Sequence, residues 1–245
     1  MRRSSLTTID PNSYRITRMA MLFLFALVGI SLVYGLSNDT AQVRMLEWVA
    51  PSGDAVWRRG RLWTLFTGPF LEPRFLSLLI EGMMMWLLMP RLERWWGPAR
   101  FALFVGATAV AATVGGTLVG LALDRPDVVL GLNPTIIAGT IAFGILYARQ
   151  PIQFFGVVPL TGRQFMWGMI ALMSLFVLLG QEWVEGGAMA AASLVGAGLA
   201  SGRLDPIATW RRRKFAKSRA HLTVVPAPEV STIPRRSKSD DRYLN

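Results

Sequence analysis

The sequence predicts an all-α integral membrane protein: a bundle of six transmembrane helices with both termini in the cytoplasm. Of its 245 residues, 52% are hydrophobic, and the mean hydropathy is +0.39, which is typical of a membrane protein. Basic residues gather at the two ends and in particular loops, as they do where charge sets topology. Six apolar runs, each long enough to be a span or nearly so, occur at residues 16–36, 75–92, 101–123, 134–149, 165–180 and 186–202.

The predicted membrane domain covers residues 16–204 and has a polar tail at each end. Residues 1–15 form a short cytoplasmic tail. The run 16–36 follows basic residues, as a signal peptide would. Its length of about 20 residues and the lack of a cleavage site before a soluble domain favour a retained span. Residues 205–245, rich in Pro, Ser and charge, are predicted to be a basic, disordered cytoplasmic tail.

Charge in the loops gives the expected orientation. The turns 124–127 and 181–185 are net acidic, whereas the loops on the other side carry Arg. The positive-inside rule therefore places both termini in the cytoplasm. The long first loop, 37–75, is an exception, because it carries several Arg on the opposite side together with many aromatics. We expect part of this loop to lie in the membrane interface.

The fourth predicted span overlaps a longer apolar run, Val128 to Tyr147, and this run contains an unusual pair for a span, Asn133-Pro134. Proline disfavours a helix interior but suits the first helical position, and Asn suits the N-cap. We therefore expect residues 128–132 to be extended and the helix to begin at Pro134. It would be about 24 Å long, short of a ~30 Å hydrocarbon core. Extended backbone at that depth needs surrounding protein or a wet cavity, so a partly buried polar site is expected at the helix start.

Small residues on the fourth and sixth runs predict close helix packing. If these two faces meet, the helix start at Asn133 comes close to Ser193. The small residues are Gly131, Thr135 and Gly139 on the fourth run, and Ala188, Ala192, Gly196 and Ala200 on the sixth.

Few residues in the spans could perform chemistry. The chain has no cysteine, which excludes thiol catalysis and disulfides, and its one histidine, His221, falls outside every apolar run. No metal site is expected, because the spans offer no His or Cys. Glu81 is an acid within a span. It either faces a functional cavity or is a structural acid hydrogen-bonded to Asn133 or Ser193.

Several motifs are ordered as in one known family. The second run leads into Glu93-Arg94-Trp95-Trp96-Gly97, a Phe-Phe-Gly-Val-Val-Pro stretch at 154–159 precedes the fifth, and the sixth ends in Gly202-Arg203-Leu204. With the long first loop and a fourth helix that begins inside the membrane, these features resemble the rhomboid superfamily over roughly residues 57–204. The resemblance implies a six-span intramembrane serine protease fold.

The residues that carry catalysis in active rhomboids are replaced here. Their Gly-x-Ser-Gly nucleophile motif corresponds to Gly131-Leu132-Asn133-Pro134, which places Asn133 at the serine position. With Gly196 as the packing glycine, Ser193 stands where the base histidine would be. Ser77 and Glu81 occupy the His and Asn positions that help to bind the oxyanion, and Glu72 falls where a further loop His often lies.

The resemblance therefore implies a pseudoprotease of a bacterial inner membrane. It would bind transmembrane segments of client proteins without cleaving them. These segments would enter laterally beside the second and fifth spans. The expected cavity is formed by Glu81, Asn133, Thr135 and Ser193. No cofactor and no nucleic acid is expected, and the partners are clients and membrane lipids. The alternatives are an active serine endopeptidase with a rearranged site, using Thr135 or Ser193, and a small transporter or channel using Glu81.

Overall fold

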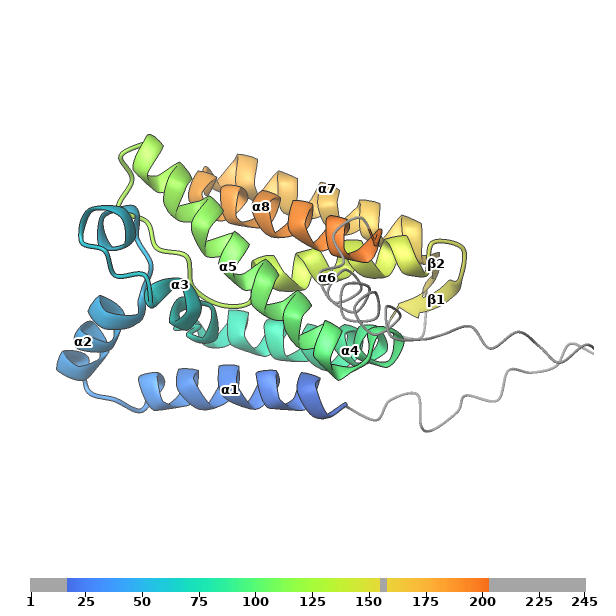
Figure 1. Cartoon of the computed structure of the whole chain (residues 1–245), viewed down its shortest axis with the longest axis horizontal. Coiled ribbons are helices and arrows are strands. Elements are labelled where there is room, and N and C mark those ends of the chain that lie inside the picture. The colour runs from blue at the N-terminus through green and yellow to red at the C-terminus, as the bar shows by residue number, and fades with distance from the viewer. Residues whose placement is uncertain (1–16, 155–157, 203–245) are drawn as a thin grey trace, which may run out of the picture. The chain divides into compact units, whose positions relative to one another are not determined.

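The computed structural model describes residues 17–154 and 158–202 (Figure 1). Both predicted tails, His221 and the centre of the 154–159 motif lie outside the described residues. The helices are α1 (Arg18–Gly35), α2 (Asp39–Val49), the π-helix η2 (Asp54–Arg58), α3 (Thr64–Thr67), the 3-10 helix η3 (Gly68–Phe70), α4 (Phe75–Trp96), α5 (Pro98–Ala122), α6 (Asn133–Leu146), α7 (Gly162–Gly180) and α8 (Trp183–Ala200), and the strands are β1 (Pro151–Phe154) and β2 (Val158–Thr161).

Within the described residues, five helices are long and apolar enough to cross a membrane: α1, α4, α5, α7 and α8. They correspond to five of the six predicted runs. The fourth run forms α6, which is apolar but has only 14 residues, or about 21 Å. The protein is therefore helical and multi-pass, with five full-length candidate spans and one short apolar helix.

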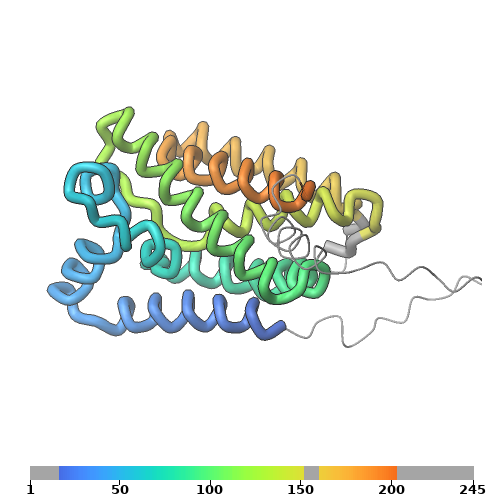
Figure 2. The backbone as a smooth tube through the Cα atoms, in the orientation of Figure 1, coloured from blue at the N-terminus to red at the C-terminus, as the bar shows by residue number. Residues whose placement is uncertain are grey.

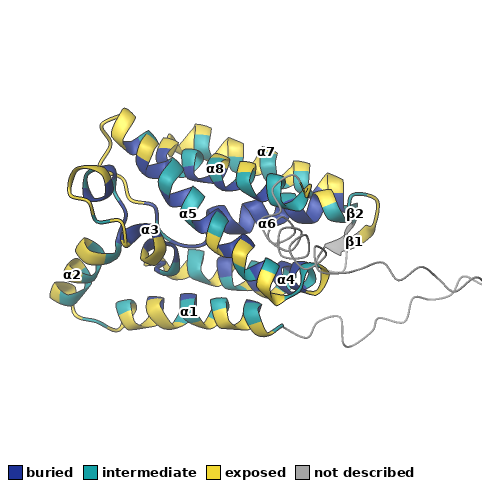
Figure 3. Cartoon of the chain, in the orientation of Figure 1, coloured by how far each residue is buried: buried dark blue, intermediate teal, exposed yellow. Residues whose placement is uncertain are grey.

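The short helix α6 lies at the centre of the bundle. It packs against α8, α7, α4 and α5, and most of its residues are buried (Figure 3). Its sequence suits this position, since Gly139, Thr140, Ala142 and Gly144 leave room for neighbours on several sides. Being enclosed by protein, α6 does not have to match the thickness of the lipid core.

The small residues of α8 pack mainly against α5 and secondarily against α6. A Cβ atom on Gly115 of α5 would collide with Ala191, and one on Gly196 would lie 2.9 Å from the Cβ of Ala138 on α6. The expected pairing is thus partly wrong. Gly139 faces Met89 of α4, and Gly131 faces two carboxylates, so neither belongs to the α8 contact. Ala188 and Ala192 are buried, whereas Ala200 is only half-buried.

Two connecting regions contain more regular structure than the sequence indicated. The first loop holds helix α2, whose Asn38 cap accepts from the N–H of Ala41, followed by η2, α3 and η3. The loop before α7 is an antiparallel hairpin of β1 and β2. Thr161 then caps α7 by a capping box with Gln164, so α7 begins at Gly162, three residues before the predicted start.

Helix α4 also holds the start of α1. The carboxylate of Glu93 accepts hydrogen bonds from the N–H of Ala20 at 2.8 Å, from the N–H of Met19 at 3.2 Å, and from the Thr17 hydroxyl. The first N–H groups of a helix lack partners within it, so an acceptor from a neighbouring helix serves as a cap. Glu93 is buried and joins α1 to α4.

Candidate functional site

The site lies where the chain enters α6. Residues 123–132 connect α5 to α6 without forming a helix (Figure 2). The stretch predicted to be extended, 128–132, differs at its end, where Gly131 and Leu132 form a bend. Val128 pairs with Ser52 of the first loop, and the N–H of Val129 donates to the carbonyl of Pro51 at 3.2 Å. Val129 and Leu132 are buried. The first loop supplies hydrogen-bond partners for this non-helical backbone, and protein covers most of it from Val129 onward.

Two acidic side chains converge on Gly131. Gly131 has φ +78°, a conformation that favours glycine. A Cβ atom there would lie 2.5 Å from Oε2 of Glu72 and 2.6 Å from Oε1 of Glu81. The two carboxylates therefore lie next to each other, and both are buried. The glycine of the predicted motif is needed here because the chain must bend where these acids leave no room.

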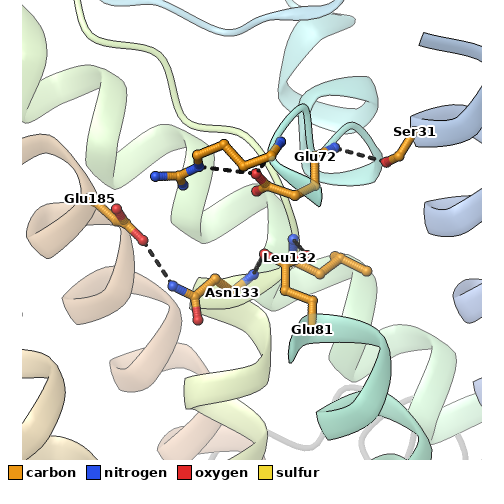
Figure 4. Close-up of polar contacts among 7 residues, drawn as sticks. Ser31, Glu72, Glu81, Leu132, Asn133 and Glu185 are labelled. Atoms are coloured by element: carbon orange, nitrogen blue, oxygen red, sulfur yellow. Dashed lines mark hydrogen bonds and ion pairs between the residues drawn. The ribbon is translucent and has the colours of Figure 1, made fainter. Parts of the chain in front are cut away.

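Glu81 caps α6 from the neighbouring helix. Its Oε2 accepts from the N–H of Leu132 and its Oε1 from the N–H of Asn133, each at 3.0 Å (Figure 4). A carboxylate at a helix N-terminus also interacts favourably with the helix dipole. The intramembrane acid singled out in the sequence thus bonds the backbone at Asn133, and both of its oxygens are occupied.

Asn133 does not cap the helix with its side chain, contrary to the prediction. The N-cap position is Leu132, and Asn133 is the first residue of α6. Its side-chain amide instead donates to Oε1 of Glu185 at 2.9 Å (Figure 4). Because Glu185 lies in the first turn of α8, this bond links the starts of α6 and α8.

Glu72, just before α4, is held on several sides. Its N–H donates to Oγ of Ser31 at 3.0 Å, and its Oε1 accepts from the N–H and Nε of Arg74 at 3.0 and 3.2 Å. Partial burial lowers the pKa of the Arg74 guanidinium. The hydrogen bond to Glu72 and the charges of Glu72, Glu185 and Glu182 outweigh this effect, so the pKa is raised above its ordinary value. Arg74 therefore lies in a strongly acidic surrounding.

A cavity of about 430 Å³ opens beside these groups, between α4 and α7. Ser77 and Glu81 of α4, Asn133 of α6 and Glu185 of α8 contribute to its wall. The remaining lining residues are Arg74, Ile80, Met173, Phe176, Val177, Gly180, Glu182 and Met189. Glu81 and Asn133 of the predicted cavity therefore share one wall with Ser77, which stands at the predicted oxyanion position.

Ser193 and Thr135 do not belong to this cavity, which corrects the predicted site. Ser193 lines an adjoining cavity of about 670 Å³, which lies between α5, α6, α7 and α8 and is mostly apolar; Met173, Val177 and Met189 line both cavities. Thr135 is buried within α6 and lines neither cavity. Of the four residues expected to form one cavity, the structure thus brings together only Glu81 and Asn133.

The described residues contain no histidine, and none of their His, Cys, Asp and Glu side chains form a group of three or more suited to a metal ion. The sequence did not predict that Glu185 belongs to the site, since it was noted only within the acidic turn 181–185. It also did not predict that Glu93 caps α1. Their acidic character was visible in the sequence, but their partners lie 52 or more residues away. Only the tertiary structure could reveal those partners.

Fold and site together define a multi-pass α-helical integral membrane protein with a cavity among its helices, whose largely apolar wall carries several carboxylates. Residues 18–200 match the family described as "Eukaryotic integral membrane protein (DUF1751)", and the chain belongs to that family. No curated protein matches it. The family description agrees with the predicted integral membrane character. It is at odds with the predicted bacterial inner membrane, because that prediction rested on resemblance and the family is described as eukaryotic.

Proposed function

We propose that this protein is a rhomboid-like, six-span pseudoprotease that binds transmembrane segments of other membrane proteins without cleaving them. In this proposal α6 is the sixth, short span and both termini are cytoplasmic. The observation that carries the proposal is the cavity between α4 and α7, which reaches from the polar start of α6 to the faces of two helices that barely touch each other.

The loose packing of α7 supports a lateral entrance. Helix α7 packs mainly against α6 and makes little contact with α8 or α4. Its only buried residues are Gly162 and Phe165, both near its beginning (Figure 3). The rest of the helix, including Phe176 on the cavity wall, is exposed or half-buried. A client helix could therefore pack beside α7 without displacing a well-packed core.

The polar groups at the cavity suit a client with polar or unwound backbone. Unpaired polar groups are costly in hydrocarbon, and a membrane segment that carries them gains from partners within a protein. Ser77, Asn133 and Glu185 line the cavity and offer hydroxyl, amide and carboxylate groups. Apolar side chains such as Ile80 and Val177 complete the wall and match the rest of a transmembrane helix.

The rival, an intramembrane serine protease, lacks support in this geometry. A serine or threonine hydroxyl needs a nearby base to become a nucleophile. Ser193 lines a largely apolar cavity, Thr135 is buried in α6, and no imidazole lies in the described part of the chain. The amide of Asn133, at the family's nucleophile position, donates a hydrogen bond to Glu185.

Site-specific cross-linking tests the binding proposal. A photoreactive amino acid replaces Phe176 or Ile80, which line the cavity, or Leu179, which is 77% exposed on α7 but is not among the residues that line it. The full-length variants are reconstituted with biotinylated single-span peptides. Cross-links are expected from Phe176 and Ile80 and not from Leu179. Equal labelling from all three positions would show that the peptides contact only the lipid-facing surface.

Two activity assays address the rivals. Cleavage of a transmembrane substrate by the purified protein, lost in Thr135→Ala or Ser193→Ala, would replace the pseudoprotease proposal with an active protease. Proton-dependent flux in liposomes, lost in Glu81→Gln, would favour a transporter or channel. The wild-type protein is expected to show no cleavage, because no imidazole lies beside Ser193 or Thr135 in the described part of the chain. It is also expected to show no flux, because each carboxylate oxygen of Glu81 is bonded to the backbone at the start of α6.

A further inference from the structure

The charges on the wall of the α4–α7 cavity are unequal. Three carboxylates, of Glu81, Glu182 and Glu185, face one guanidinium, that of Arg74. Each carboxylate oxygen of Glu81 accepts one backbone N–H, and Arg74 is paired with Glu72 at 3.2 Å. Both side chains therefore already have polar partners within the protein.

The carboxylates of Glu182 and Glu185 have fewer partners within the protein. Within the described part of the chain, neither has a Lys or Arg at salt-bridge distance. Glu185 is half-buried and accepts one hydrogen bond, from the neutral amide of Asn133, while Glu182 is exposed at the start of α8. Both carboxylates lie close enough to Arg74 to contribute to the raised pKa of its guanidinium, but beyond salt-bridge distance.

We propose that the transmembrane segments bound here carry a basic residue, whose cationic group pairs with Glu185 and Glu182 in the α4–α7 cavity. This inference rests on the proposed function and specifies the class of client. The cation enters at the depth of the α8 start, within the outer turns of the client helix.

The energetics of a charge in a membrane favour this pairing. A Lys or Arg in a span is costly in lipid and is stabilised by an acidic partner facing a cavity. Its long apolar stem can pack along Ile80 and Val177 while the charged end reaches the carboxylates. An acidic client residue at the same depth would be repelled by Glu182 and Glu185, and an apolar one would leave Glu185 without a cationic partner.

Peptide binding to the full-length protein in phosphatidylcholine nanodiscs tests the inference. The probes are apolar single-span peptides that are identical except for one Lys, Gln or Glu, scanned over the outer two turns. Affinities are measured by energy transfer between labelled peptide and protein. At the best position, the Lys peptide is expected to bind roughly tenfold more tightly than the Gln peptide, as for a charge-assisted hydrogen bond, and the Glu peptide more weakly than either.

Charge-removing variants locate the effect. In the variant Glu182→Gln/Glu185→Gln, the amide oxygen at 185 can still accept from Asn133, so the fold is retained while the Lys preference is lost. The matched control is Glu47→Gln, an exposed acid of α2 that does not line the cavity, and it is expected to keep the full preference. The reversal Glu185→Lys is expected to favour the Glu peptide.

The possible outcomes separate the inference from the function on which it rests. Equal binding of Lys and Gln peptides would overturn the charge preference and leave client binding intact. A Lys preference that persists in the double variant would overturn its assignment to Glu182 and Glu185. Loss of the preference in phosphatidylethanolamine would assign the carboxylates to the lipid amine instead of a client residue. Absence of binding by every peptide would overturn the proposed function as well.

Discussion

The carboxylate of Glu81 occupies the space that a side chain at Gly131 would require: a Cβ atom there would lie 2.6 Å from Oε1 of Glu81. The same carboxylate accepts the N–H groups of the next two residues, Leu132 and Asn133. The bend at Gly131 and the cap of α6 are therefore one arrangement, in which the glycine makes room for the acid that holds the helix start.

Gly131→Ala is expected to destabilise the protein by about 2–4 kcal/mol, because the new methyl group meets Glu72 and Glu81 and the positive φ disfavours a side chain. Tryptophan fluorescence during thermal unfolding in detergent measures the change. Gly60→Ala is a useful control, since Gly60 also has a positive φ but has nothing within 4 Å of its Cβ position. A loss equal to that of the control would mean that contact with the carboxylates is unimportant.

Glu81→Ala is expected to cost about 2–5 kcal/mol, since it leaves the N–H groups of Leu132 and Asn133 without an acceptor in a buried site. Glu81→Gln retains one acceptor oxygen and is expected to lose about half as much. Ser77→Ala, which alters the same cavity one turn earlier on α4, is expected to stay within about 0.5 kcal/mol of wild type. Thermal unfolding of all three variants measures these losses of stability. A loss in Glu81→Ala no larger than that in Ser77→Ala would contradict the capping role.

Glu93→Ala is expected to loosen the start of α1 by removing the acceptor of three hydrogen bonds, at a cost of about 2–4 kcal/mol. Limited proteolysis followed by mass spectrometry reports this locally, as faster cleavage near residues 17–20. Glu93→Gln should give an intermediate rate, and Glu47→Gln, in the exposed part of α2, the wild-type rate. Unchanged cleavage in Glu93→Ala would indicate that α1 is held by its apolar contacts alone.

Two glycines of α5 offer a matched pair. Gly115→Ala is expected to destabilise the protein by about 1–3 kcal/mol, because its methyl group collides with Ala191 and lies 2.9 Å from the carbonyl oxygen of Gly187. Gly106→Ala meets nothing within 4 Å and is expected to be neutral or to stabilise by up to about 1 kcal/mol through its greater helix propensity. Thermal unfolding of the two variants should therefore shift in different directions or by clearly different amounts.

Hydrophobicity and proline chemistry explain the features that the sequence could predict. The long apolar runs correspond to α1, α4, α5, α7 and α8, because in lipid the backbone must satisfy its own hydrogen bonds as helix. Asn133-Pro134 correctly indicated an interrupted fourth run, and α6 begins within one residue of the expected position. Glu81 was recognised because an ionisable residue within a span is energetically costly, and its carboxylate does bond the start of α6.

The remaining features depend on contacts that leave no local pattern. The family resemblance places Glu72 at a position where a loop His often lies, but no local pattern shows that its carboxylate meets Gly131. Nothing near Glu185 indicates that it accepts the Asn133 amide. Ser193 was placed at the site by assuming that α6 and α8 pack with a particular face, whereas α8 packs most extensively against α5. The spacing of Gly and Ala identifies the helix face that carries small residues, but it does not identify the helix against which that face packs.

The two acids of α4 also bear on the order in which the chain assembles during synthesis. Glu93 receives the start of α1, which leaves the ribosome before α4, and Glu81 receives the start of α6, which leaves after it. A nascent chain that ends before α4 therefore contains an α1 whose start lacks the Glu93 acceptor. A nascent chain that ends just after α4 contains Glu81 without the N–H donors of Leu132 and Asn133. Helix α4 thus completes the start of a helix made earlier and supplies the acceptor for a helix made later.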